Sequence, residues 1–194
     1  MVRRSYYIIN GITVYRLLAA PLMVIFIFNR NLDLFKWLLP LSFFTDLVDG
    51  YLARKFKVTS ILGTKLDSIA DDLTIVAAVI GIFVFKPGFI RENILVISIM
   101  LVLYVLQIVL SLVRYHKLSG FHTYTAKTAA ILQGTFLILV FILSEPIYWL
   151  FYLAAFVTTL DLIEETILVL LLPEWEANVK GIYWVMQKRK KKRN

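Results

Sequence analysis

Long apolar stretches follow one another along the chain, and short polar segments separate them. Each stretch approaches the roughly 20 residues that an α-helix needs to cross the hydrocarbon core of a bilayer. The polar residues that interrupt the first stretch, Asn10, Thr13 and Arg16, recur every three positions and therefore share one helical face. The pattern predicts six membrane-spanning helices. Their approximate bounds are 7–28, 34–54, 61–85, 94–113, 125–143 and 147–172.

The lysines and arginines between the predicted helices fall mainly on one side of the membrane. That side would carry Arg3, Arg4, Arg54, Lys55, Lys57, Arg114, Lys117 and the C-terminal tail. The other side would carry Arg30, Lys36, Lys86 and Arg91. Cytoplasmic loops of membrane proteins are enriched in such residues. Because an even number of spans places both termini on one face, we expect both termini in the cytoplasm.

The composition agrees with an all-α integral membrane protein and limits the chemistry of any site. Of 194 residues, 60% are hydrophobic, and the mean hydropathy is +0.78, so the chain has more apolar surface than one soluble core can bury. Cysteine is absent and only 2 histidines occur, so a metal would be bound by oxygen, which favours Mg²⁺, Mn²⁺ or Ca²⁺. The net charge of +8 does not indicate nucleic-acid binding, because the basic residues are confined to loops and the tail.

The C-terminal tail differs from the rest of the chain. It combines aromatic and apolar residues with a run of lysines and arginines that begins at Lys188. Such a segment suits the surface of an anionic leaflet. A solvated anchor on the positive side of the membrane explains the pattern equally well, and both interpretations stay open. We therefore divide the chain into a six-helix domain, residues 1–178, and a basic, aromatic cytoplasmic tail, residues 179–194.

Four aspartates flank the predicted cytoplasmic loop between the second and third helices, so a cavity built around them would open to the cytoplasm. They are Asp46, Asp49, Asp67 and Asp71. Spacings of three and four place the members of each pair on one helical face, one turn apart. Four carboxylates at membrane depth need positive charge among them. Divalent cations are one source, and the alternative is a set of ion pairs with Arg16, Arg54 and Lys65.

The same stretch resembles the signature of the CDP-alcohol phosphotransferase (phosphatidyltransferase) family. It reads Asp46-x-x-Asp49-Gly50-x-x-Ala53-Arg54 and, after eight residues, Gly63-x-x-x-Asp67-x-x-x-Asp71. The upstream pattern Asn10-x-x-Thr13-x-x-Arg16 resembles the first helix of the bacterial phosphatidylglycerophosphate synthase-type members. Asp72 lies outside the signature, and we expect it to pair with a lysine.

The resemblance implies a reaction and the residues that carry it. The resemblance to the bacterial phospholipid synthases of the family implies transfer of a phosphatidyl group from CDP-diacylglycerol to the hydroxyl of a small polar alcohol, with release of CMP. Two divalent ions, Mg²⁺ or Mn²⁺, would be held by Asp46, Asp49, Asp67 and Asp71, and Asp71 would also take the proton of the hydroxyl. The residues expected to contact the CDP group are Asn10, Thr13, Asp49, Gly50, Ala53, Arg54 and Gly63. The family also implies a homodimer, here in a bacterial cytoplasmic (inner) membrane.

The acceptor alcohol is less well defined. Arg114 and Lys127 bracket one predicted cytoplasmic loop and would suit the phosphate of glycerol 3-phosphate, our first choice, or of inositol phosphate. Ordinary loop charge explains them equally well. Asp161 and Glu165, with Glu164 beside them, either pair with a basic residue or bind an amine. Inositol, serine and other amino alcohols therefore stay open as acceptors.

A transporter is the competing class of function. In that interpretation the aspartates would line a path for cations across the membrane. Such a path requires carboxylates at several depths, whereas the four aspartates cluster near one predicted face. The clustering therefore favours an enzyme that works at the membrane surface.

Overall fold

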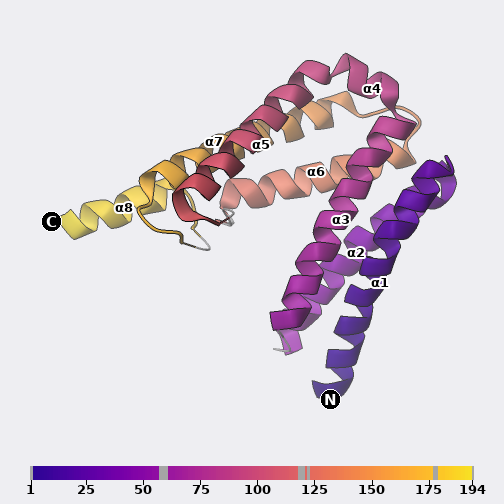
Figure 1. Cartoon of the computed structure of the whole chain (residues 1–194), viewed down its shortest axis with the longest axis horizontal. Coiled ribbons are helices and arrows are strands. Elements are labelled where there is room, and N and C mark those ends of the chain that lie inside the picture. Colours follow the sequence, from indigo (N-terminus) through magenta and orange to yellow (C-terminus); the bar gives the residue numbers. More distant parts are fainter. Residues whose placement is uncertain (1, 57–60, 118–120, 122, 177–178, 194) are drawn as a thin grey trace. The chain divides into compact units, whose positions relative to one another are not determined.

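The computed structural model describes residues 2–56, 61–117, 121, 123–176 and 179–193, and every regular element within these ranges is an α-helix (Figure 1). The helices are α1 (Val2–Phe28), α2 (Leu32–Phe56), α3 (Ile61–Phe85), α4 (Pro87–Glu92), α5 (Ile94–Tyr115), α6 (Tyr124–Ile142), α7 (Tyr148–Leu171) and α8 (Ile182–Arg193). The six long helices, all except α4 and α8, coincide with the six predicted apolar stretches and differ from them only at their ends.

Three segments among the described residues are long and apolar enough to cross a membrane. They are Gly11–Phe28 in α1, Ile94–Tyr115, which is α5, and Tyr124–Ile142, which is α6. Helix α7 is of similar length, but three acidic side chains interrupt its second half. The protein is thus a helical membrane protein. The spanning of α2, α3 and α7 and the orientation of the chain stay predictions.

The two shorter helices were not predicted. Helix α4 has 6 residues, which is too short for an apolar period to become visible in the sequence. Helix α8 contains the basic tail, where lysines and arginines outnumber the apolar residues that would indicate a buried face. Neither element is therefore visible in the hydrophobic pattern of the sequence.

One compact unit contains residues Met1–Arg91 and Leu137–Ser144. Within it, α1 packs against α2 and α3, and Figure 1 shows the three helices side by side. Small residues, such as Ala19 and Ala20 of α1 and Ala77 and Ala78 of α3, are buried and let the helix backbones approach closely. Contact between α1 and both of its neighbours brings side chains of three helices to one place.

The end of α6 completes this first unit. Phe141 packs edge-on against Phe35 of α2, with 4.8 Å between the ring centroids, and Phe35 also lies 5.5 Å from Phe85 of α3. Gly81 of α3 allows these rings to approach, because a Cβ there would lie 2.8 Å from the Cζ atom of Phe35. The Lys86 ammonium group donates to the carbonyl oxygen of Ser144 at 2.8 Å and links the two chain segments.

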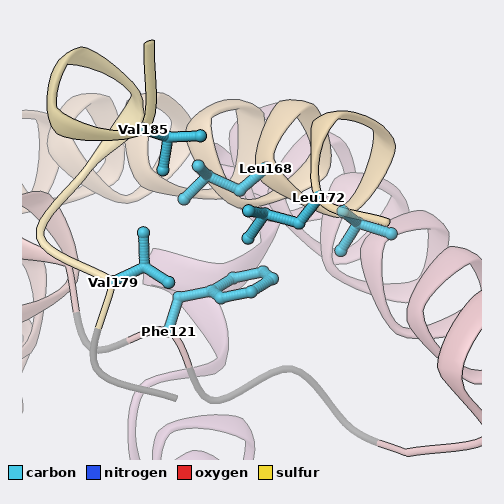
Figure 2. Close-up of a cluster of buried hydrophobic side chains, with 6 residues drawn as sticks. Phe121, Leu168, Leu172, Val179 and Val185 are labelled. Atoms are coloured by element: carbon cyan, nitrogen blue, oxygen red, sulfur yellow. The ribbon is translucent and has the colours of Figure 1, made fainter. Parts of the chain in front are cut away.

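The second unit contains residues Glu92–Phe136 and Glu145–Asn194, and α5 packs against α7 within it. The Tyr115 hydroxyl at the end of α5 lies 2.9 Å from the Val169 carbonyl oxygen and 2.8 Å from that of Leu172. A small apolar core lies at this end of α7 (Figure 2). Its buried members are Phe121, Leu168, Val169, Leu172, Val179 and Val185. Because Val179 and Val185 come from the tail, α8 is anchored to the end of α7.

Candidate active site

Arg16 of α1 contacts carboxylates of the aspartate signature from two other helices. Its guanidinium lies 2.9 Å from Oδ1 of Asp46 and 3.5 Å from Oδ2 of Asp49, both on α2. It also forms an ion pair with Asp71 of α3. Arg16 is 1% exposed. The packing of α1 against α2 and α3 therefore creates one charged cluster, the Arg16–aspartate cluster, from residues that are far apart in the sequence.

The three carboxylates of this cluster differ in their access to solvent. The Asp49 side chain is 3% exposed, whereas those of Asp46 and Asp71 are 35% and 38% exposed. The cluster is therefore closed on the side of Asp49 and open on the side of the other two. Three carboxylates surround a single guanidinium, so these four groups together carry net negative charge. Such a site favours further cations.

The structure places the predicted site residues of this unit in three groups. Asp46, Asp49 and Asp71 come together around Arg16. Thr13 is buried one turn before Arg16 on α1, which agrees with the shared helical face. The remaining predicted residues lie in helices, but their side chains are outside the described part of the structure. They are Asn10, Gly50, Ala53, Arg54, Gly63 and Asp67.

The role of Arg16 is larger than its sequence suggested. We expected it as the last residue of the first-helix pattern and as one possible ion-pair partner of the aspartates or of the acidic residues at 161–165, and the structure contains its pairing with the aspartates. One signal could have singled it out. An arginine inside an apolar helix must meet buried negative charge, and the aspartate signature is the nearest acidic cluster along the chain.

The residues of the cluster fit a divalent cation by their chemistry. Carboxylate oxygens are the ligands that Mg²⁺ and Mn²⁺ prefer. Their present spacing is set by a guanidinium, which is larger than a metal ion, and among the described side chains no group of three or more His, Asp or Glu is close enough together to hold one. A bound cation would therefore require the carboxylates to close around it where Arg16 now lies.

Arg114 and Lys127, predicted to bind the acceptor, lie in the second unit. Nε of Arg114 donates to the Leu172 carbonyl oxygen at 3.2 Å, so the arginine covers the carboxyl end of α7. Lys127 is exposed in the first turn of α6, and its ammonium nitrogen lies 5.6 Å from the centre of the Tyr124 ring. Lys127 is thus accessible to an anion, whereas Arg114 already binds the backbone.

The acidic residues of α7 make hydrogen bonds within the same unit. Asp161 accepts from the hydroxyls of Thr123 and Thr125, at 3.1 and 3.2 Å. Glu164 accepts from the Thr125 hydroxyl and from the backbone N–H at the start of α8, and Glu165 accepts from the Gln107 amide at 2.8 Å. Hydroxyl, amide and backbone groups are the donors in these contacts.

The threonines at the start of α6 were missed in the sequence. The Thr123 hydroxyl oxygen accepts from the backbone N–H of Ala126 at 3.0 Å, as an N-cap residue does. A threonine directly before an apolar run is the usual sequence signal for such a cap. That signal would have identified the cap, whereas the hydrogen bond that the Thr123 hydroxyl donates to Asp161 is visible only in the folded chain.

Comparison with known proteins agrees with the signature. Residues 6–160 match the family model for CDP-alcohol phosphatidyltransferases. This match covers well over half of the chain, and the protein belongs to the CDP-alcohol phosphatidyltransferase family. The family resemblance predicted from the aspartates is thereby confirmed.

Several curated proteins are similar to this chain over different lengths. A cardiolipin synthase (CMP-forming)/mitochondrial hydrolase fusion protein of Schizosaccharomyces pombe is 48% identical over 63 residues, which are 32% of this chain and 10% of that protein. A CDP-diacylglycerol–glycerol-3-phosphate 3-phosphatidyltransferase of Haemophilus influenzae is 38% identical over 73 residues, 36% of this chain and 39% of that protein. The chain thus spans well under two thirds of these relatives.

A further relative is similar over a greater length. The CDP-diacylglycerol–glycerol-3-phosphate 3-phosphatidyltransferase of Rickettsia typhi is 29% identical over 163 residues, which are 77% of this chain and 89% of that protein. No solved structure matches this chain.

Proposed function

We propose that this protein transfers a phosphatidyl group from CDP-diacylglycerol to the hydroxyl of a small polar alcohol and releases CMP. One observation carries the proposal: three aspartates of the family signature converge on a single point between α1, α2 and α3. Family membership supports the reaction class. The names of the relatives in Haemophilus influenzae and Rickettsia typhi support glycerol 3-phosphate as the acceptor.

In this reaction the acceptor oxygen attacks the phosphorus that carries the diacylglycerol group. A new phosphorus–oxygen bond forms, the bond to the phosphate of CMP breaks, and CMP leaves with the bonding electrons. The acceptor loses its hydroxyl proton, which we assign to the carboxylate of Asp71. That carboxylate is 38% exposed and an acceptor can reach it, whereas the buried Asp49 is covered by the protein.

We propose Mg²⁺ or Mn²⁺ as the cofactor, with two ions held by Asp46, Asp49, Asp67 and Asp71. Bound there, the ions would neutralise the pyrophosphate and the departing CMP. Thr13 is buried beside Arg16 and would contribute a hydroxyl to the nucleotide site. Further contacts with CDP are assigned, from the family pattern, to Asn10, Asp49, Gly50, Ala53, Arg54 and Gly63.

For the acceptor we propose Lys127 as the phosphate ligand that is open to solvent, with Arg114 as a second basic group. Asp161 and Glu165 are assigned to the acceptor site as well, where hydroxyl and amide groups of the protein already donate to them. Acceptors without a phosphate, such as inositol or serine, have no need of Lys127. Replacement of Lys127 by methionine should therefore raise KM for glycerol 3-phosphate but leave KM for a phosphate-free acceptor unchanged.

The test is a panel of acceptors scored for CMP release by the purified full-length protein. CDP-diacylglycerol and Mg²⁺ or Mn²⁺ are supplied with glycerol 3-phosphate, inositol phosphate, inositol, serine or ethanolamine. We expect CMP with glycerol 3-phosphate, and no CMP after removal of divalent cations by a chelator. Binding of CDP-diacylglycerol without CMP from any acceptor would overturn the proposal. Cation flux in liposomes without CMP release would instead favour the transporter.

A further inference from the structure

We propose that Arg16 is a built-in competitor of the divalent cations: its guanidinium neutralises the aspartates in the empty site, and it must leave them when cations bind. The inference rests on the proposed function, because it assigns the cations to the same three aspartates. It goes beyond that function by giving Arg16, which is outside the aspartate signature, a defined part in controlling metal affinity.

Arg16 and a cation need the same place in the cluster. The guanidinium lies within salt-bridge distance of Asp46 and Asp49 and also contacts Asp71, so it lies where the three carboxylates converge. A divalent ion binds carboxylate oxygens at roughly 2.0–2.6 Å, which leaves no room for N–H groups between ion and ligand. The two positive groups therefore exclude each other at this point.

Arg16 cannot give up its positive charge. The guanidinium of arginine stays protonated in proteins, and here the side chain is 2% exposed. A cation that enters the cluster thus meets a fixed positive charge in a region of low dielectric, where repulsion between like charges is strong. The repulsion lowers the affinity of the site for a cation that arrives alone.

The guanidinium of Arg16 can leave the cluster on one side. The side chains of Asp46 and Asp71 are about one third exposed, so the cluster is open on one side. Arginine has a long flexible stem and can move its charged end towards such an opening. A displaced guanidinium then needs another anion, and a pyrophosphate group is a suitable bidentate partner.

Metal and nucleotide should therefore bind cooperatively. The nucleotide supplies the anion that receives Arg16, so a cation binds weakly alone and more tightly when the nucleotide is present. Linkage requires that the cation strengthens nucleotide binding by the same factor. Arg16 would thus keep the site from filling with metal before the donor arrives.

The experiment measures Mn²⁺ binding to the full-length protein in detergent by electron paramagnetic resonance, with and without CDP as the probe. For Arg16→Met we expect Mn²⁺ without CDP to bind at least about tenfold more tightly than to the unchanged protein. We also expect CDP to increase the Mn²⁺ affinity of Arg16→Met by a smaller factor than that of the unchanged protein. Arg91→Met is the control, because it removes an exposed arginine from α4, beyond the far end of α3.

Arg16→Met leaves three carboxylates without their central charge, which can unfold the protein. A second variant therefore tests the inference independently. Arg16→Lys keeps the charge but not the forked guanidinium, and it should bind Mn²⁺ as weakly as the unchanged protein. Thermal unfolding supplies another measure, because Mn²⁺ should raise Tm more in Arg16→Met than in the unchanged protein. Equal or weaker Mn²⁺ binding by folded Arg16→Met, or an equal rise in Tm, would overturn the inference.

Failure of the proposed function would give a different result. If the unchanged protein bound no Mn²⁺ even with CDP, or bound it equally well after Asp46→Asn and Asp71→Asn, the aspartates would not be the metal site. Mn²⁺ binding that depends on the aspartates but not on Arg16 would leave the function standing and remove only the role of Arg16.

Discussion

Asp71 and Asp72 are adjacent carboxylates on α3 with different surroundings. Asp71 contacts Arg16 in the charged cluster, whereas Asp72 is exposed. Successive residues of a helix point in directions about 100° apart, so only one of two neighbours can face α1. The pair therefore offers a matched comparison of a site aspartate with a surface aspartate of the same charge.

Replacement of Asp71 by asparagine should abolish turnover. The amide has nearly the same shape but cannot accept the hydroxyl proton, and general-base catalysis contributes about 10²–10⁴-fold to a rate. We expect CMP release to fall by at least about 100-fold, with binding of CDP-diacylglycerol largely kept. Asp72→Asn should retain most of the activity. Full activity of Asp71→Asn would show that another group takes the proton.

At the scale of the elements, Gly81 determines how closely α3 approaches the aromatic rings of α2 and α6. A Cβ at this position would lie 2.8 Å from Phe35 and 3.1 Å from Phe141, and both phenylalanines are buried. Gly81→Ala should therefore destabilise the first unit by about 1–3 kcal/mol through overpacking, although alanine favours helix. A lower Tm of the detergent-solubilised protein would be the measurement.

Gly134 of α6 is the control for this substitution. No atom outside its own helix lies within 4 Å of a Cβ placed there, so Gly134→Ala adds helix propensity without a clash. We expect Tm to stay equal or to rise. An unchanged Tm for Gly81→Ala would mean that the phenylalanine rings move aside without cost.

Glu164 joins two elements, α7 and α8. Its carboxylate accepts from the backbone N–H of Ile182 at 3.0 Å, at the first residue of α8. Gly181 directly before it has a φ of 146°, a conformation that L side chains rarely adopt, and a Cβ there would lie 2.8 Å from the Glu164 carboxylate. The start of α8 thus depends on one acidic side chain and one glycine.

Loss of this contact should loosen the tail. In Glu164→Ala the N–H of Ile182 has no carboxylate to bind, so we expect faster tryptic cleavage after the exposed Lys180. Glu174→Ala removes an exposed acid of equal charge and should leave the cleavage rate unchanged. Equal rates for the two variants would indicate that the apolar contacts of Val179 and Val185 hold the tail without Glu164.

At the scale of the whole molecule, the absence of cysteine allows the predicted topology to be tested directly. Single cysteines can be placed at Lys117, between α5 and α6, and at Ser144, between α6 and α7. If α6 spans the membrane and both termini are cytoplasmic, an impermeant thiol reagent should label Ser144→Cys from outside and Lys117→Cys only from the cytoplasmic side. The cysteine-free parent is the control. Labelling of both from one side would contradict a spanning α6.

The sequence alone determined the six long helices and the family of this protein. Apolar stretches of membrane-spanning length appear locally, so the bounds of the six long helices could be predicted closely, and polar segments such as 29–31 mark where they break. The aspartate signature likewise depends on spacing within two neighbouring helices. Both properties involve residues close together along the chain, which is why no knowledge of packing was needed.

The tertiary structure decided which side chains meet. Arg16 contacts Asp46 and Asp71 only because α1 packs against both α2 and α3, and spacing along the chain does not encode that packing. In the same way, Asp161 accepts a hydrogen bond from the hydroxyl of Thr123, which lies at the start of another helix. Such partners are set by helix faces and crossing points, which depend on many small contacts over the whole unit. The charge balance of the site therefore became visible only in the folded chain.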